Sequence, residues 1–140
     1  MSKGSTSDQL PITINFGLYL TNFQNMTQQA NELLKQGISQ YQGHQFEAAL
    51  ISWQEALALY QEMDDRRRSG AALGNMGVAY EALGDYARAI DCYQQHLGLA
   101  REMGDRRGEA NALGNLGNAC YALEDFDGAI NYQQQRLTIA

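Results

Sequence analysis

Apolar residues recur at intervals of three and four positions along most of this chain. That spacing places them on one face of an α-helix, so the pattern predicts helices rather than strands. Short breaks that contain glycine or aspartate separate the apolar stretches, and both residue types are common where helices end or begin. The predicted helices run over residues 27–41, 46–63, 66–83, 86–103, 106–123 and 125–140.

The predicted helices form pairs that repeat with a constant offset. Gly37, Gly77 and Gly117 are 40 positions apart, and three alanines show the same spacing at Ala49, Ala89 and Ala129. A fixed period in this range indicates an array of stacked hairpins rather than one globular core. We therefore predict an all-α solenoid of about three helix-turn-helix hairpins. They occupy residues 26–64, 65–104 and 105–140, and the third is truncated.

The repeated glycines predict a close contact between the two helices of each hairpin. A glycine inside a helix costs about 1 kcal/mol relative to alanine, so its recurrence needs a reason. We expect Ala49, Ala89 and Ala129 to face these glycines. Small residues on both sides would bring the helix axes to the short end of the usual separation of roughly 8–10 Å.

The first 25 residues lie outside this pattern. Met1–Asp8 is polar and rich in serine, which is typical of disordered ends. Apolar residues then alternate with others from Ile12 to Leu20, which is the period of a strand. Because a lone strand is not stable, we expect residues 1–25 to be a flexible or extended tail. An alternative is that this segment lies extended against the helical array.

Charge and cysteine content exclude several classes of function. The net charge of −6 is unsuited to nucleic acid, whose phosphates require clustered lysine and arginine. No apolar run reaches the roughly 20 residues that a membrane helix needs. Cys92 and Cys120 form no metal or redox motif, and no secretion signal is recognisable. We therefore expect a cytoplasmic protein that binds neither nucleic acid nor membrane.

Side chains that carry out catalysis are not arranged in any known motif. His44 lies in a predicted turn and His96 in a helix of another repeat, so they do not suggest a metal site. The glycine-rich segments at 73–77 and 113–117 superficially resemble phosphate loops, but they lie inside predicted helices and follow no strand. We expect no enzymatic activity, no metal and no cofactor.

The repeated residues resemble the tetratricopeptide repeat family. In the second repeat the family pattern of apolar, Leu-Gly-like, aromatic, alanine and aromatic positions is matched by Leu73, Met76-Gly77, Tyr80, Ala89 and Tyr93. The resemblance covers residues 27–140 and implies a right-handed α-solenoid. The period of 40 exceeds the family's usual length of about 34, and is similar to the long-helix arrays of Pins-type polarity scaffolds and bacterial signalling proteins.

This chain departs from the family pattern at several positions. The aromatic position of Tyr80 becomes Gln40 and Cys120, and that of Tyr93 becomes Gln133 in the third repeat. The pattern's second alanine, present as Ala56, becomes His96 and Arg136.

The resemblance also implies where a partner would bind. In this family the first helix of each hairpin lines a concave groove that holds a protein or an extended peptide. Asparagine amides both donate and accept hydrogen bonds, so they can pair with a peptide backbone of any sequence. The candidate peptide-binding residues are Asn75, Val78, Arg107, Asn111, Asn115, Asn118 and Tyr121. In the first repeat, the implied groove positions are Asn31, Leu34, Lys35, Ile38 and Tyr41.

Some of these residues have structural alternatives. Asn75 and Asn115 would also suit hydrogen bonds to buried groups between neighbouring repeats. Arg107 would pair with a ligand carboxylate at the groove rim, or simply be a solvated surface charge. The Lys and Asn set with which chaperone-binding members grip a C-terminal carboxylate is matched only by Lys35 and Asn75.

A second function is open at this point. The last predicted helix has an apolar face without a following neighbour, which favours a structural array that pairs with another copy. In a variant of this idea, the segment from Ile12 to Leu20 occupies the groove as a built-in ligand.

Overall fold

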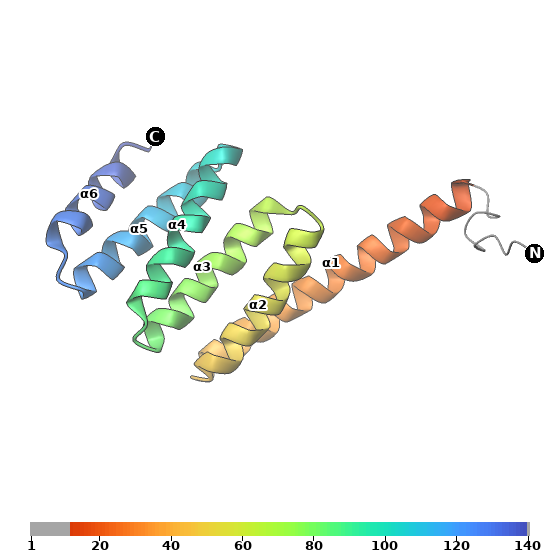
Figure 1. Ribbon diagram of the computed structural model, residues 1–140, viewed down its shortest axis with the longest axis horizontal. Helices are drawn as coiled ribbons and strands as arrows, with labels where there is room; N and C mark the ends of the chain where they lie inside the picture. The colour runs from red at the N-terminus through yellow and green to blue at the C-terminus, as the bar shows by residue number, and fades with distance from the viewer. Residues whose placement is uncertain (1–11, 140) are drawn as a thin grey trace, which may run out of the picture.

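The structure is a computed structural model that describes residues 12–139, with side chains from Phe16 onward. Within that range the chain forms helices and no strand. Figure 1 shows three hairpins side by side in a row, which confirms the predicted all-α solenoid. The helices are α1 (Ile12–Gln42), α2 (Phe46–Glu62), α3 (Arg66–Ala82), α4 (Tyr86–Met103), α5 (Arg106–Ala122) and α6 (Phe126–Leu137).

Aspartates begin four of these helices. In each case the side-chain oxygen accepts a hydrogen bond from the backbone N–H three residues later, at 3.0–3.1 Å. This bond satisfies one of the N–H groups that the first turn of a helix leaves unpaired. Because the same cap recurs at both helices of the second and third repeats, the start of each of these four helices is set locally by the sequence. The first repeat lacks it, since Gln45 before α2 makes no side-chain cap. The four caps are Asp65, Asp85, Asp105 and Asp125.

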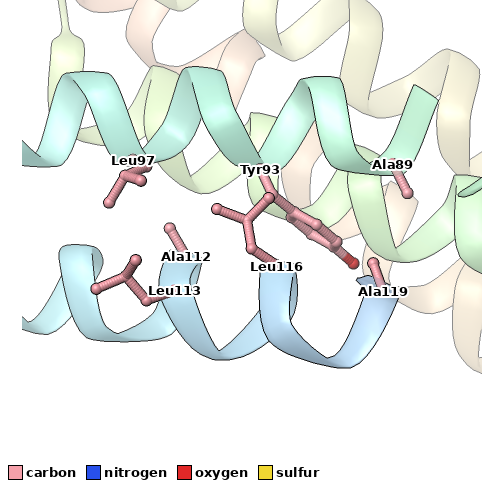
Figure 2. Packing of buried hydrophobic residues seen from close by; sticks show 7 residues of the cluster. All are labelled: Ala89, Tyr93, Leu97, Ala112, Leu113, Leu116 and Ala119. Atoms are coloured by element: carbon pink, nitrogen blue, oxygen red, sulfur yellow. The ribbon is translucent and has the colours of Figure 1, made fainter. Parts of the chain in front are cut away.

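Buried residues lie between neighbouring hairpins as well as between the two helices of each hairpin. Figure 2 shows the junction of α4 and α5, where Leu97 lies beside Leu113 and Ala89 faces Ala119. Tyr93, only 1% exposed, fills the space between these pairs. Two further buried clusters join α1, α2, α3 and α4. The array is therefore held together by a series of neighbour-to-neighbour cores, as expected for a solenoid.

The repeated glycines do make a close contact, but the predicted partner is wrong. A methyl group on Gly77 would come closer than 3.0 Å to the ring of Tyr93, and one on Gly37 would overlap the ring of Trp53 in the same way. The alanine of the second hairpin, Ala89, belongs instead to the cluster shared with α5. In the first two repeats the glycine therefore makes room for an aromatic ring, and the alanine packs against the next hairpin. In the third repeat Gly117 faces Gln133 instead.

The expectation of an extended tail is wrong for residues 12–25, because α1 is continuous from Ile12 to Gln42. Residues 1–11 lie outside the described range. Phe16, Leu20 and Phe23 are spaced by four and three, so the segment fits a helix as well as the alternation that we read as a strand. A helix satisfies its own backbone, whereas a strand needs a neighbour. The first half of α1 projects beyond the hairpins, so Ile12–Leu20 does not lie in the groove (Figure 1).

Candidate peptide-binding groove

A cavity of about 510 Å³ lies between the second and third hairpins. The first helices of those hairpins, α3 and α5, supply most of its walls, as the family resemblance implied. Single side chains from the second helices α4 and α6 complete it. The lining residues are Arg67, Ala71, Gly74, Asn75, Val78, His96, Asp105, Arg107, Gly108, Ala110, Asn111, Gly114, Asn115, Asn118 and Arg136.

The structure brings most of the candidate peptide-binding residues together in this cavity. Asn75 and Val78 come from α3, and the others come from α5: Arg107, Asn111, Asn115 and Asn118. Tyr121 is the exception. It is 66% exposed, its ring packs edge-on against Phe126 at 5.4 Å, and it borders a second cavity of about 330 Å³. Asn118 lines both cavities, so the two are neighbours along α5.

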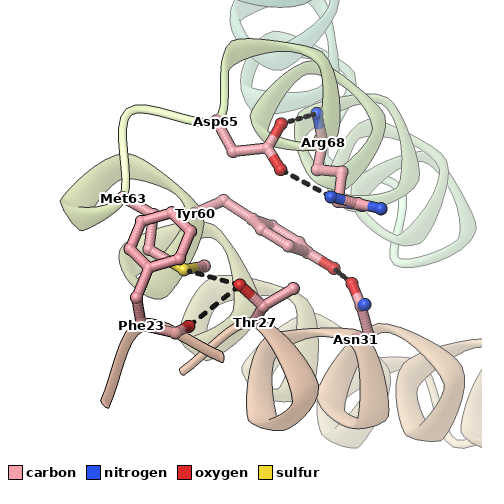
Figure 3. Close-up of polar contacts among 7 residues, drawn as sticks. All are labelled: Phe23, Thr27, Asn31, Tyr60, Met63, Asp65 and Arg68. Carbon is pink, nitrogen blue, oxygen red and sulfur yellow. Dashed lines mark hydrogen bonds and ion pairs between the residues drawn. The ribbon is translucent and has the colours of Figure 1, made fainter. Parts of the chain in front are cut away.

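The first repeat does not contribute to the 510 Å³ cavity. Asn31 and Lys35 line a separate cavity of about 670 Å³ near the projecting part of α1. Asn31 already accepts a hydrogen bond of 2.6 Å from the buried Tyr60 hydroxyl (Figure 3). Nearby, the Thr27 hydroxyl contacts the Met63 sulfur at 3.2 Å. In this repeat the predicted groove residue Asn31 therefore joins α1 to α2.

The groove asparagines have free amides. Asn75 and Asn115 are half-buried, and Asn111 and Asn118 are exposed. None of the four makes a side-chain hydrogen bond with any residue between 12 and 139. The alternative in which Asn75 and Asn115 satisfy buried groups between repeats therefore finds no partner in the described chain. All four amides remain available to a ligand.

His96 and Arg136 are among the cavity residues that the sequence did not predict, because they belong to second helices. In the first repeat the corresponding position is Ala56, and a large residue, Leu34, occupies the facing inner helix. In the later repeats the small residue is on the inner helix and the large one is on the second helix. The inner residue becomes Gly74 or Gly114, whose absent side chains leave room for the His96 ring and the Arg136 guanidinium. The departures from the family pattern at these positions were the available signal.

The cavity is electropositive although the whole chain is acidic. It contains three arginines and one aspartate, against a net charge of −6 for the protein. Arg67 pairs with that aspartate, Asp105, across the two hairpins at 3.3 Å. Burial lowers the pKa of His96, with a smaller opposing effect from Asp105, so the imidazole is neutral at pH 7. The remaining positive charge comes from Arg107 and Arg136.

Three further observations concern the thiols, possible metal ligands and the helix lengths of the described residues. Burial raises the pKa of the Cys92 thiol to about 11, so the reactive thiolate is scarce at neutral pH. Over residues 12–139 there is no group of three or more histidine, cysteine and acidic side chains able to hold a metal. In the same part of the chain, none of the helices is both long enough and apolar enough to cross a bilayer.

The stacked hairpins and their polar inner groove define an α-solenoid of the tetratricopeptide repeat class. The sequence profile described as Tetratricopeptide repeat matches residues 29–102 and 71–140, so the chain belongs to this family. The crystal structure of the TPR domain of Arabidopsis FLU has the same fold, with a TM-score of 0.76. That domain is 21% identical over 80% of this chain and 94% of its own. No curated protein sequence matches the chain. Repeats of this family generally mediate protein–protein interactions.

Proposed function

We propose that the 510 Å³ cavity holds an extended segment of a partner protein. The observation that supports this best is the set of asparagine amides with no hydrogen-bond partner in the described chain: Asn75, Asn111, Asn115 and Asn118. Each amide can donate to a backbone carbonyl and accept from a backbone N–H. A set of such groups can hydrogen-bond to the backbone of a bound segment whatever its sequence.

The arrangement of the amides favours an extended ligand. Asn111, Asn115 and Asn118 follow one face of α5 over two turns, a rise of roughly 10 Å. An extended chain advances about 3.3 Å per residue, so roughly three ligand residues fit along this stripe. Asn75 and Val78 lie on the facing helix α3 and contact the ligand from the other side.

We place this binding function in the cytoplasm. Cys92 and Cys120 are both unpaired thiols, which a reducing compartment maintains. The buried position of both side chains gives them a packing role rather than a catalytic one, and the proposed function is non-catalytic.

Replacing two amides should weaken binding without unfolding the array. The full chain is used to select from a display library of random linear peptides of about ten residues, long enough to span roughly 33 Å when extended. We expect Asn115→Ala with Asn118→Ala to weaken the selected peptides about tenfold or more, since each lost hydrogen bond is worth about 0.5–1.5 kcal/mol. Fluorescence anisotropy titration measures the change.

The matched control removes two asparagines of another helix. Asn22 and Asn25 are exposed on the projecting part of α1 and line none of the cavities described above. Asn22→Ala with Asn25→Ala should leave affinity unchanged, and thermal unfolding should show both double variants folded. Equal affinity of the groove variant and the wild type would show that peptides do not use this stripe.

A second function, self-association, is favoured by one observation on α6. Leu97 of α4 is 7% exposed because α5 covers it, whereas its counterpart Leu137 is 84% exposed. Ile130 is 56% exposed, although its counterpart Ile90 packs against the core of the next hairpin. The same surface that joins repeats within the chain is thus open on α6, and we propose a second copy as its occupant.

Charge on this face should break the self-association. We expect the wild-type chain to gain mass with concentration in analytical ultracentrifugation, and Ile130→Glu with Leu137→Glu to remain monomeric, since burying unpaired carboxylates is costly. Ile51→Glu is the control, because Ile51 is equally exposed on α2, far from α6 in the chain. A wild-type chain that stays monomeric over the full concentration range rules the idea out.

A further inference from the structure

The arginines of this protein differ in whether they pair with a carboxylate. Several pair with carboxylates at 2.8–3.6 Å: Arg66, Arg67, Arg68, Arg88 and Arg101. Arg107 and Arg136 make no ion pair and no side-chain hydrogen bond with any residue of the described range. These two unpaired cations come from different helices, α5 and α6, yet both line the 510 Å³ cavity. Although the chain has more acids than bases, no acidic side chain of the described residues pairs with these two arginines at the groove.

Arg136 enters the groove from the second helix of its hairpin. Its guanidinium passes over Gly114 of α5, where a methyl group would lie 3.4 Å from a terminal nitrogen. The first repeat has Leu34 and Ala56 at the corresponding positions, so no second-helix side chain has room to reach the groove there. The glycine on the inner helix therefore determines that a second-helix residue contacts the ligand.

We propose that Arg107 and Arg136 form a specificity site that binds the carboxylate of an aspartate or glutamate side chain in the bound segment. This inference rests on the proposed peptide-binding function and assigns the chemistry of one ligand position. A guanidinium matches a carboxylate in charge and in planar hydrogen-bond geometry, which makes such a pair stronger than a neutral hydrogen bond.

The ligand group is a side chain rather than a chain end. Asn111 lies one turn before Gly114 on α5, and Asn118 lies one turn after it. Amides that grip the backbone are therefore present on both sides of the point where Arg136 enters the cavity. A segment held by all of them crosses this point and continues, so it presents a side chain there.

The surrounding charge limits the acidic residue to one position. The protein as a whole carries a charge of −6, which repels a uniformly acidic segment. At physiological ionic strength charges are screened beyond roughly 8 Å, which is about two residues of an extended chain, so the two arginines act only on the short stretch of ligand beside them. We therefore expect selected peptides to have one acidic residue with neutral or basic neighbours.

The test measures how strongly the selected peptides bind to variants that lack arginines inside or outside the cavity. Arg107→Gln with Arg136→Gln should weaken binding roughly tenfold to a hundredfold and reduce its dependence on salt. Replacing the ligand's acidic residue by its amide should cause a similar loss, whereas amidating its C-terminus should have no effect. Arg88→Gln is the control, because Arg88 lies on α4 outside the cavity and carries the same charge.

Reversing the charge of Arg136 should change which peptides are selected, an effect that general destabilisation of the protein would not produce. Peptides selected by Arg136→Glu should carry a lysine or arginine where the wild-type peptides carry an acid. Peptides that lose affinity with the asparagine variant but bind equally to the double glutamine variant would overturn the arginine site and leave the groove function standing. If no peptide depends on the asparagines, both proposals fail. If affinity falls on C-terminal amidation alone, the site binds a chain end and this inference is wrong.

Discussion

Replacing Leu116 by alanine should lower the free energy of unfolding by about 2–5 kcal/mol, the range for deleting a fully buried leucine. Leu116 has no exposed surface and lies between Tyr93 and Leu113 in the cluster that joins α4 to α5 (Figure 2). The surrounding side chains are themselves close-packed, so the space left behind fills only in part. Denaturant unfolding followed by circular dichroism measures the loss.

Leu137 provides a matched control for this substitution. It is a helical leucine of the same array, but 84% of its surface is exposed. Measured at a concentration where the chain is monomeric, Leu137→Ala should therefore change stability by no more than about 0.5 kcal/mol. If both variants lost the same free energy, the junction of α4 and α5 would not be a core of the fold.

The Leu116 variant should also unfold less cooperatively. Each hairpin of a solenoid contacts only its neighbours, so stability is a sum of hairpin and junction contributions. A weaker junction between α4 and α5 frees the third hairpin to open before the rest. Amide hydrogen exchange should then speed up in α5 and α6 more than in α3. A uniform acceleration along the chain would argue against independent junctions.

Gly77→Ala should destabilise the protein by about 1–3 kcal/mol, although alanine is the better helix former by about 1 kcal/mol. The new methyl group would meet the ring of Tyr93 at a distance that real side chains do not adopt. Tyr93 is held on every side, with 1% of its surface exposed, and Glu81 lies beside its hydroxyl. The ring cannot move away, so overpacking outweighs the gain in helix propensity. Thermal unfolding monitored by circular dichroism gives the difference.

Two other glycines separate these effects. Gly98 lies inside α4 with nothing near its missing side chain, so Gly98→Ala should stabilise the protein by about 0.5–1 kcal/mol. At Gly117 the new methyl group meets the flexible Gln133, whose side chain can adopt another rotamer. Gly117→Ala should therefore lower the free energy of unfolding less than Gly77→Ala does. If Gly77→Ala stabilised the protein as Gly98→Ala does, the contact with Tyr93 would not be the reason for the glycine.

Much of the candidate groove could be predicted from helical spacing and from the repeat. The stripe of Asn111, Asn115 and Asn118 follows from helical spacing, because the opposite stripe carries the leucines that must be buried. Asn75 and Val78 follow from the repeat, which places α3 and α5 in equivalent positions. Tyr121 fits the same stripe, but it lies beyond the end of the cavity and packs on Phe126 instead.

The side chains that the second helices contribute to the groove could not be predicted from the sequence pattern of a single repeat. Arg136 and His96 stand where the family has alanine, and each reaches the groove only because the facing inner residue is glycine. Whether such a side chain reaches the groove depends on residues of two helices, whereas hydrophobic periodicity describes one helix at a time. Within the part of the chain that the structure describes, Arg107 and Arg136 have no acidic partner, and this too is a property of the assembled surface.

The sequence by itself determined the helices, their caps and their pairing into repeats, because hydrophobic spacing and aspartate caps act within one or two turns of the chain. It did not determine the state of Ile12–Leu20, where helix and strand patterns coincide and only a partner strand would decide between them. The tertiary structure alone decided which side chain each glycine faces and which polar groups stay unpaired, because both depend on how neighbouring helices pack.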